Sequence, residues 1–294
     1  MSQPSLWQVR KEVCDIGQRI WQRGFCAGNE GNHSVRISED RVLCTPTGLS
    51  KGFLSPDDLC VVDMDGTQVE PNARGRKRTS EVLVHLAIYK KQPTIKAVIH
   101  SHPPHAVAFC LANIPLPEGI HPEAEVFLGR TIFSKYATPG GPDLPNSFID
   151  QITEQTNTIL MANHGSVSLG TNLIESYYRL EILDNYCKQL ILAKQLGQVN
   201  VLNTDQMVDL LKVKERFGFP DDRLKCATGG CVGSDNEPFL TTFGVQPMSA
   251  SCNCDGNVQH AAPPAPAASN PTDPAFEQLV QSITDRIMAQ ANGG

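Results

Sequence analysis

Two histidines separated by one residue follow an apolar run, where their side chains could bind one shared ligand. Residues 97–99 have the composition of a buried strand and lead directly into His100 and His102. Side chains of a strand alternate between its two faces, so both imidazoles are expected on the same face. Neutral imidazole is the commonest metal ligand in proteins, and the pair therefore predicts part of a metal site.

A third histidine and a carboxylate could complete this site. His164 ends a second apolar stretch, 158–162, and if the two strands lie close together, three imidazoles converge. Three neutral histidines that leave a fourth position open are typical of catalytic Zn²⁺. Glu81 is the candidate acid/base, because it lies in the first turn of a predicted helix, where the helix dipole favours its charge. The alternatives are histidines with ordinary hydrogen bonds and a glutamate that only caps its helix.

Three turns of small polar residues are candidates for holding an anion. They offer backbone N–H groups and hydroxyls with no bulky side chain in the way. The residues concerned are Asn29, Asn32, Thr47, Gly48, Thr79 and Ser80. The last two also lie at a predicted helix N-terminus, which favours phosphate. Each turn alone is more simply a turn, but beside a metal site the three predict a phosphorylated substrate. The other histidines before residue 165 are interpreted as structural or as neighbours of the site; these are His33, His85, His105 and His121.

Helices and strands alternate along the first 225 residues, with several hairpins among them. The hydrophobic pattern predicts helices over 6–20, 80–91, 106–111, 148–156, 173–196 and 208–217, and strands over 34–37, 41–45, 59–63, 95–100, 132–136 and 158–162. Thr79 or Ser80 is the expected N-cap of the second helix. This order predicts an α/β layered domain with a mixed, mostly antiparallel sheet.

The overall composition excludes several classes of protein. The net charge of -6 and the lack of a long basic run argue against nucleic acid as a partner. No apolar run is long enough to span a membrane, and the polar N-terminus is no signal peptide. Six of the ten cysteines are scattered singly through apolar segments, which indicates buried thiols in a reducing cytoplasm.

The composition changes after about residue 225. A segment rich in Cys and Gly occupies 226–260, an Ala/Pro-rich linker follows over 261–272, and an amphipathic terminal helix is predicted over 273–290. Four thiolates could hold a structural metal or an iron–sulfur cluster, but their spacing is not the usual paired one. A loose segment with free thiols is the favoured interpretation of Cys226, Cys231, Cys252 and Cys254.

Six motifs, in the same order, resemble the class II aldolase/adducin family, and within it the L-fuculose-phosphate aldolases. They are Gly-Asn-x-Gly-Asn at 28–32, Thr-Pro-Thr-Gly at 45–48, Ser-Glu at 80–81, His-Ser-His at 100–102, Tyr-Ala-Thr-Pro-Gly at 136–140 and Asn-His-Gly at 163–165. The resemblance covers about residues 8–220. It implies a three-layer α/β/α fold, a homotetramer with active sites between subunits, and a catalytic domain over 1–225.

The resemblance also implies roles for individual residues. Zn²⁺ would be held by His100, His102 and His164, with Glu81 as a further ligand of the resting metal and as the acid/base. The six turn residues named above would hold phosphate. The implied reaction is zinc-dependent retro-aldol cleavage of L-fuculose 1-phosphate or L-rhamnulose 1-phosphate to dihydroxyacetone phosphate and lactaldehyde.

Two departures from the family pattern leave the aldehyde-side proton donor unassigned. The positions of two family tyrosines correspond here to the neighbourhood of His121 and to Phe217, and His121 and Glu123 are the candidate substitutes. A pentulose-phosphate 4-epimerase, a sugar-phosphate dehydratase and a non-catalytic adducin-like binding module stay open as alternatives. Glu81 favours an aldolase over the epimerase, which has aspartate there, and the retained histidines argue against a mere binding module.

The C-terminal extension resembles the encapsulation peptides that load enzymes into bacterial microcompartments. A linker followed by a short amphipathic helix suits docking into a groove of a shell or cargo protein. The expected location is therefore the cytoplasm, with loading into a microcompartment as a further hypothesis. The alternative is that 273–290 packs on its own tetramer. A membrane-surface helix is disfavoured, because the polar face lacks a basic stripe.

Overall fold

The computed structural model describes residues 4–219, 221–229 and 236–242, all within the first of two units, Met1–Gly244. The predicted linker 261–272 and terminal helix 273–290 lie outside the described residues, as does most of 226–260. Cys231, Cys252, Cys254 and the side chain of Cys226 lie outside them as well.

The described helices and strands follow the order that the sequence predicts, except that the predicted helix 148–156 is missing and that three short helices and one strand are additional. They are α1 (Leu6–Gln22), β1 (Asn32–Arg36), β2 (Arg41–Cys44), β3 (Cys60–Asp63), α2 (Val82–Lys91), β4 (Ala97–Ser101), α3 (Pro104–Ala112), α4 (Pro122–Phe127), β5 (Ile132–Ser134), α5 (Asp143–Asn146), β6 (Thr158–Met161), β7 (Gly165–Gly170), α6 (Leu173–Leu196), α7 (Thr204–Arg216) and α8 (Glu237–Thr242). None of these helices is long and apolar enough to cross a membrane.

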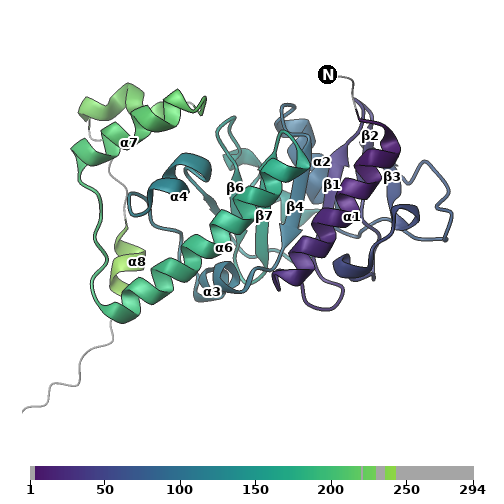
Figure 1. Ribbon diagram of the computed structural model, residues 1–294, viewed down its shortest axis with the longest axis horizontal. Coiled ribbons are helices and arrows are strands. Elements are labelled where there is room, and N and C mark those ends of the chain that lie inside the picture. Colours follow the sequence, from purple (N-terminus) through teal and green to yellow (C-terminus); the bar gives the residue numbers. More distant parts are fainter. Residues whose placement is uncertain (1–3, 220, 230–235, 243–294) are drawn as a thin grey trace, which may run out of the picture. The chain divides into compact units, whose positions relative to one another are not determined.

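The strands form one seven-stranded sheet in the order β3-β2-β1-β4-β7-β6-β5. Every neighbouring pair is antiparallel except β5 and β6, which are parallel. The prediction of a mixed, mostly antiparallel sheet is therefore confirmed. Figure 1 shows α1 and α6 crossing one face of this sheet.

Successive side chains of the central strands face opposite sides of the sheet, and each side packs against helices. On β4, Val98 packs in one core with Val82 and Leu86 of α2. Its neighbour Ile99 faces the opposite core, which includes Ile16 of α1 and Leu180 of α6. Both faces of the sheet are thus covered by helices, as expected for a three-layer α/β/α fold.

One predicted helix is wrong. The segment 148–156 contains only a short 3₁₀ turn, Ile149–Gln151. The hydroxyl of Thr156 accepts a hydrogen bond from the backbone N–H of Thr153 at 2.9 Å, and that of Thr153 accepts one from the N–H of Gln155 at 3.3 Å. These local bonds compete with a helical backbone and explain the turn.

Three further details correct the sequence analysis. The N-cap of α2 is Glu81, whose side chain makes no capping hydrogen bond, rather than Thr79 or Ser80. The short helix α4 was not expected. Strand β7 was also not expected, because its serines and terminal glycines hide its apolar residues, although all six of its residues are buried.

Candidate active site

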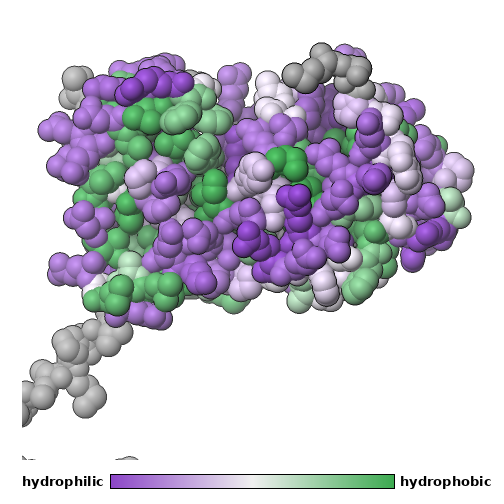
Figure 2. Space-filling view, in the orientation of Figure 1, coloured by the Kyte–Doolittle hydropathy of each residue, from purple (hydrophilic) through white to green (hydrophobic). Residues whose placement is uncertain are grey.

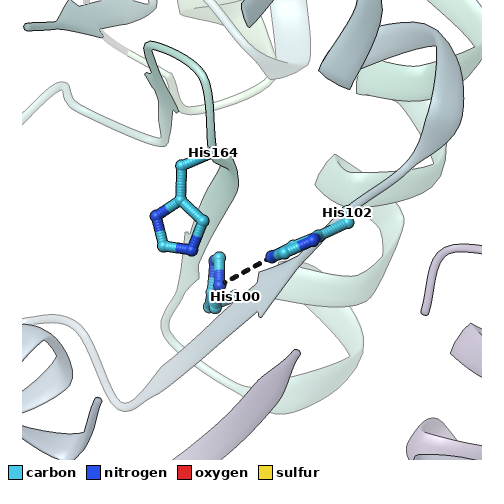
Figure 3. Close-up of side chains that lie close together, drawn as sticks. All are labelled: His100, His102 and His164. Carbon is cyan, nitrogen blue, oxygen red and sulfur yellow. Dashed lines mark hydrogen bonds between the residues drawn. The ribbon is translucent and has the colours of Figure 1, made fainter. Parts of the chain in front are cut away.

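Strand β4 places the side chains of His100 and His102 next to each other. His100 lies within the strand and His102 directly after it, and their Nε2 atoms are 3.1 Å apart. Both rings point toward His164, which reaches the same space from a neighbouring loop (Figure 3). The candidate ligand atoms of these three residues lie within 4.8 Å of one another. The predicted convergence of three imidazoles therefore occurs.

The position of His164 relative to β4 differs from the prediction. It does not end a strand beside β4, because β7 lies between β4 and β6. It lies in the tight turn from β6 to β7, and the pairing of Ser166 with Ser101 brings this turn to the end of β4. Gly165 permits the close approach, since a Cβ atom there would lie 2.8 Å from Cδ2 of His102.

Glu81 faces two of the three imidazoles. Its Oε2 atom is 3.3 Å from Nε2 of His100, and its Oε1 atom is 3.5 Å from Nε2 of His164. The amide of Asn32 donates a hydrogen bond to Oε2 at 2.8 Å, and Asn32 pairs with His100 across the sheet. The start of α2 and the start of β1 thus place the carboxylate beside the histidines.

The contacts of the two Nδ1 atoms favour tautomers in which both Nε2 atoms can accept. Nδ1 of His100 donates to the carbonyl of Ser166 at 3.0 Å, and Nδ1 of His102 faces Oε2 of Glu30 at 3.0 Å. With both protons on Nδ1, the lone pairs on the two Nε2 atoms face each other, which is repulsive unless a cation joins them. Without a cation, one Nε2 atom must carry the proton of the hydrogen bond drawn in Figure 3. Two nitrogens bound tetrahedrally to zinc, each about 2.0–2.1 Å from it, lie roughly 3.3 Å apart.

Burial keeps two of the three imidazoles in the neutral state that binds metal. Desolvation, helped by the two neighbouring imidazoles, holds the pKa of His100 well below its ordinary value. Desolvation also lowers the pKa of His164, although the charge of Glu81 opposes this shift. Within the described residues, Oε1 of Glu81 and Nδ1 of His164 are buried without a hydrogen-bond partner. These observations fit a divalent cation with nitrogen and carboxylate ligands.

The three predicted anion-binding turns lie side by side. The N–H of Thr47 donates to the carbonyl of Lys77 at 3.0 Å, and the N–H of Thr79 donates to the carbonyl of Thr45 at 3.1 Å. These bonds join the second turn to the third, in which Ser80 is exposed. Gly48 adopts a positive φ of 71° and would have open space around an added Cβ atom.

Lys51 joins the first turn to the second, and the sequence analysis missed it. Its ammonium group donates to the carbonyls of Asn29 and Leu49, each at 2.7 Å. The residue is 1% exposed, and burial lowers the pKa of its amine. No described carboxylate forms a salt bridge with it. A lysine next to glycine in a turn gives no periodic signal of burial, so only the fold reveals this cation.

Glu30 is the second residue that the sequence analysis missed. It occupies the variable position of the Gly-Asn-x-Gly-Asn motif, from which the sequence predicts only backbone N–H groups as ligand-binding groups. Its carboxylate instead contacts His102, as described above. The available signal was that this carboxylate lies inside a predicted ligand-binding turn.

The candidate aldehyde-side groups do not join the cluster. His121 caps α4 by accepting from the N–H of Ala124 at 3.4 Å, and its Nε2 atom is 3.4 Å from Glu123. Within the described part of the chain, no hydrogen bond links either residue to Glu81 or to the three histidines. Phe217 lies at the end of α7 and is 65% exposed.

The remaining histidines of the described residues have structural partners. His33 contacts the carbonyl of Val13 at 2.7 Å, and His85 contacts the hydroxyl of Ser34 at 2.7 Å. His105 contacts Asp184 at 2.8 Å. These contacts join helices to the sheet or to each other and leave the cluster to the other three imidazoles.

Two kinds of named protein resemble the chain. It is 33% identical over 207 residues to 3-oxo-tetronate 4-phosphate decarboxylase from Haemophilus influenzae, covering 69% of this chain and 96% of that protein. It is 34% identical over 178 residues to L-fuculose phosphate aldolase from Methanococcus vannielii, covering 60% and 93%.

Solved structures of related proteins also resemble the chain. An L-fuculose 1-phosphate aldolase superposes with a TM-score of 0.65 at 28% identity, covering 72% of this chain and 97% of that one. A Klebsiella pneumoniae protein described as a putative aldolase/epimerase/decarboxylase superposes with a TM-score of 0.64 at 27% identity, covering 71% and 100%. The sequence profile of the class II aldolase and adducin N-terminal domain matches residues 11–191, and with this fold and histidine cluster the chain belongs to that family.

Proposed function

We propose that the protein is a zinc-dependent lyase that breaks a carbon–carbon bond next to the carbonyl group of a phosphorylated sugar or sugar acid. The observation that carries this proposal is the cluster of His100, His102 and His164 with Glu81 against two of its rings. The three histidines would hold the metal, and Glu81 would be a further ligand only in the resting site. A bound zinc ion acts as a Lewis acid that stabilises negative charge on substrate oxygens.

The protein's own residues would bind the substrate and move a proton. The turns around Asn29, Gly48 and Ser80 bind the phosphate group, which supplies binding energy away from the broken bond. Bond cleavage leaves an electron pair on the carbon next to the ketone. Glu81, in its protonated form, donates a proton to that carbon and ends as a carboxylate.

The first candidate reaction is retro-aldol cleavage of L-fuculose 1-phosphate or L-rhamnulose 1-phosphate. The C3–C4 bond breaks, the C4 hydroxyl loses its proton and lactaldehyde leaves, while C3 gains a proton to give dihydroxyacetone phosphate. The resemblance to L-fuculose phosphate aldolases supports this reaction. It requires a base for the C4 hydroxyl, and His121 and Glu123 are the candidates from this chain.

The second candidate reaction is decarboxylation of 3-oxo-tetronate 4-phosphate. The C1–C2 bond breaks, carbon dioxide leaves and C2 gains a proton, which again gives dihydroxyacetone phosphate. The resemblance to 3-oxo-tetronate 4-phosphate decarboxylases supports this reaction. It needs no base for a leaving aldehyde, which agrees with the lack of a described contact between His121 or Glu123 and the cluster.

One assay tests the proposal and separates the two reactions. Purified protein is incubated with each of the three substrates, with zinc and after chelation, and dihydroxyacetone phosphate is measured. Zinc-dependent release from a ketose phosphate, with lactaldehyde, identifies an aldolase, whereas release with carbon dioxide identifies a decarboxylase. No release from any substrate by zinc-loaded protein would refute both and favour the epimerase or dehydratase alternative. Failure to bind zinc would favour an adducin-like binding module.

We further propose a homotetramer. Apolar side chains gather on the surface over α7 and α8 (Figure 2). The exposed large apolar residues in this part of the chain include Leu192, Leu196, Val201 and Leu240. Exposed apolar patches often mark protein–protein contacts. Light scattering of the purified protein tests this proposal.

The extension 273–290 is proposed to dock on microcompartment shell or cargo proteins. The amphipathic sequence pattern and the Ala/Pro-rich linker before it support this proposal. Fusion of 261–294 to a fluorescent protein, co-expressed with microcompartment shell proteins, tests it by whether the fluorescence becomes punctate.

A further inference from the structure

We propose that Glu30 is a positioning residue of the metal centre, which fixes the tautomer and orientation of His102 and thereby increases metal affinity. The inference rests on the proposed metal-dependent function. It assigns a role to the variable position of the Gly-Asn-x-Gly-Asn turn, between the residues proposed to hold phosphate.

The contact is specific to one ring nitrogen. Oε2 of Glu30 lies 3.0 Å from Nδ1 of His102, the ring nitrogen that does not face His100. A carboxylate cannot donate a hydrogen bond, so this contact favours the metal-binding tautomer, in which the ring proton is on Nδ1. In that tautomer the lone pair of His102 is on Nε2, the atom that faces His100 at 3.1 Å.

The carboxylate is itself held in place. Its Oε1 atom accepts a hydrogen bond from the N–H of Ala27 at 2.6 Å, so both oxygens are engaged. The backbone of His102 is fixed on the same side, because its N–H donates to the carbonyl of Phe25 at 2.8 Å. The segment 25–30 and His102 are thus joined by one side-chain contact and one main-chain hydrogen bond.

In a metal site, a carboxylate partner of this kind would strengthen the binding of the metal. A histidine ligand usually donates its other ring N–H to a carboxylate or carbonyl, which makes the ligating nitrogen more basic. His100 uses the carbonyl of Ser166 for this purpose, whereas His102 has the negatively charged Glu30. Removal of such a partner typically weakens metal binding by about 10–100-fold.

The competing interpretation is that Glu30 only stabilises its own turn. Under that interpretation, its replacement lowers thermal stability but leaves the zinc affinity of the folded protein unchanged. Zinc affinity therefore distinguishes a positioning role from a merely structural one, and it does so without measuring catalysis.

The test measures zinc affinity of the full-length chain by competition with a chromophoric chelator. Glu30→Ala is expected to bind zinc about 10–100-fold more weakly than the wild type. Glu30→Gln is expected to lie between the two, because its amide oxygen still accepts from Nδ1–H but carries no charge. Glu39→Gln, a change at an exposed hairpin, is the matched control and should bind like the wild type.

The outcomes separate this proposal from the proposed function. Tight zinc binding by the wild type and equally tight binding by both Glu30 variants would overturn the role of Glu30 while leaving the lyase proposal intact. A wild-type protein that binds no zinc would overturn the metal centre as a whole. If Glu30→Ala fails to fold, the comparison of Glu30→Gln with the wild type decides the question.

Discussion

Glu81 holds one carboxylate oxygen against the amide of Asn32 and leaves the other, Oε1, buried without a hydrogen-bond partner in the described residues. Oδ1 of Asn32 and Nδ1 of His164 share this condition. An unpartnered buried polar atom costs about 1–3 kcal/mol of folding free energy. Three such atoms around one carboxylate and one imidazole are characteristic of groups arranged for a ligand rather than for stability.

The change Glu81→Gln should therefore separate activity from stability. Loss of the proton-transfer group is expected to lower the release of dihydroxyacetone phosphate by about 10²–10⁴-fold. The unfolding temperature, measured in the presence of a chelator, should stay the same or rise, because a charge confined in the site is removed and the bond from Asn32 is kept. Glu39→Gln is the control for both measurements. Retained activity, or a marked loss of stability, would contradict the assigned role.

The residue types revealed the cluster, but not the groups that support it. His100, His102, His164 and Glu81 were predicted because spacing, strand ends and a helix start are visible in the sequence. Glu30 and Lys51 were not, because their roles depend on which turns the fold brings together. A single charged residue in a turn is usually solvated, and nothing local distinguishes these two from that case.

At the scale of elements, the turns that precede β1 and follow β2 share one buried cation. Lys51 donates a hydrogen bond to one carbonyl of each turn. Because the residue is buried, water cannot replace either contact. Hydrogen bonds to a charged group contribute about 1.5–3 kcal/mol each. The ammonium thus fixes the relative position of two proposed phosphate-binding turns.

Lys51→Met is expected to weaken anion binding. The methionine fills a similar volume but holds neither carbonyl, and it removes the only positive charge that the structure places between these turns in the described residues. The affinity for inorganic phosphate, measured by calorimetry, should fall about tenfold, or about 1.4 kcal/mol, because the turns lose their fixed spacing and the anion loses a nearby positive charge. Lys90→Met, at an exposed ion pair with Asp65, should have no such effect. Equal phosphate affinity in the two variants would exclude this role.

Element prediction succeeded where apolar periodicity was strong and failed where polar side chains bonded to the backbone. The helix α6 begins after Asn172, whose side chain accepts from the N–H of Glu175 at 2.8 Å, as the sequence predicts. Strand β7 escaped prediction because its two serines are buried, and the hydroxyl of Ser166 donates to the carbonyl of Ser101 on the neighbouring strand at 3.3 Å. Such partners are known only when the neighbouring strand is known.

For the whole molecule, the sheet is held to its helices partly through buried neutral histidines. Burial lowers the pKa of His33 to about 4 and that of His85 to about 3. Their pKa in the unfolded chain is about 6.5. Between these values the unfolded chain binds more protons, so each residue contributes stability that is complete above about pH 6.5 and is lost as the pH falls toward its folded pKa.

Acid should therefore destabilise the protein from about pH 6.5 downward, and His33→Gln should reduce this dependence. Glutamine can still donate to the carbonyl of Val13 but does not titrate. The free energy of unfolding, measured with urea in the presence of a chelator, should fall less steeply between pH 6 and 4.5 in the variant, by about 1 kcal/mol per pH unit. An identical slope in the two proteins would show that His33 is not buried neutral.

The turn 27–31 is contacted from two sides, by Lys51 through the carbonyl of Asn29 and by His102 through the carboxylate of Glu30. One rigid piece of backbone thereby belongs to two binding events, that of the anion and that of the metal. If each event restricts the same turn, the two are thermodynamically linked, and the linkage is reciprocal. The factor by which zinc tightens the binding of phosphate is then the factor by which phosphate tightens the binding of zinc.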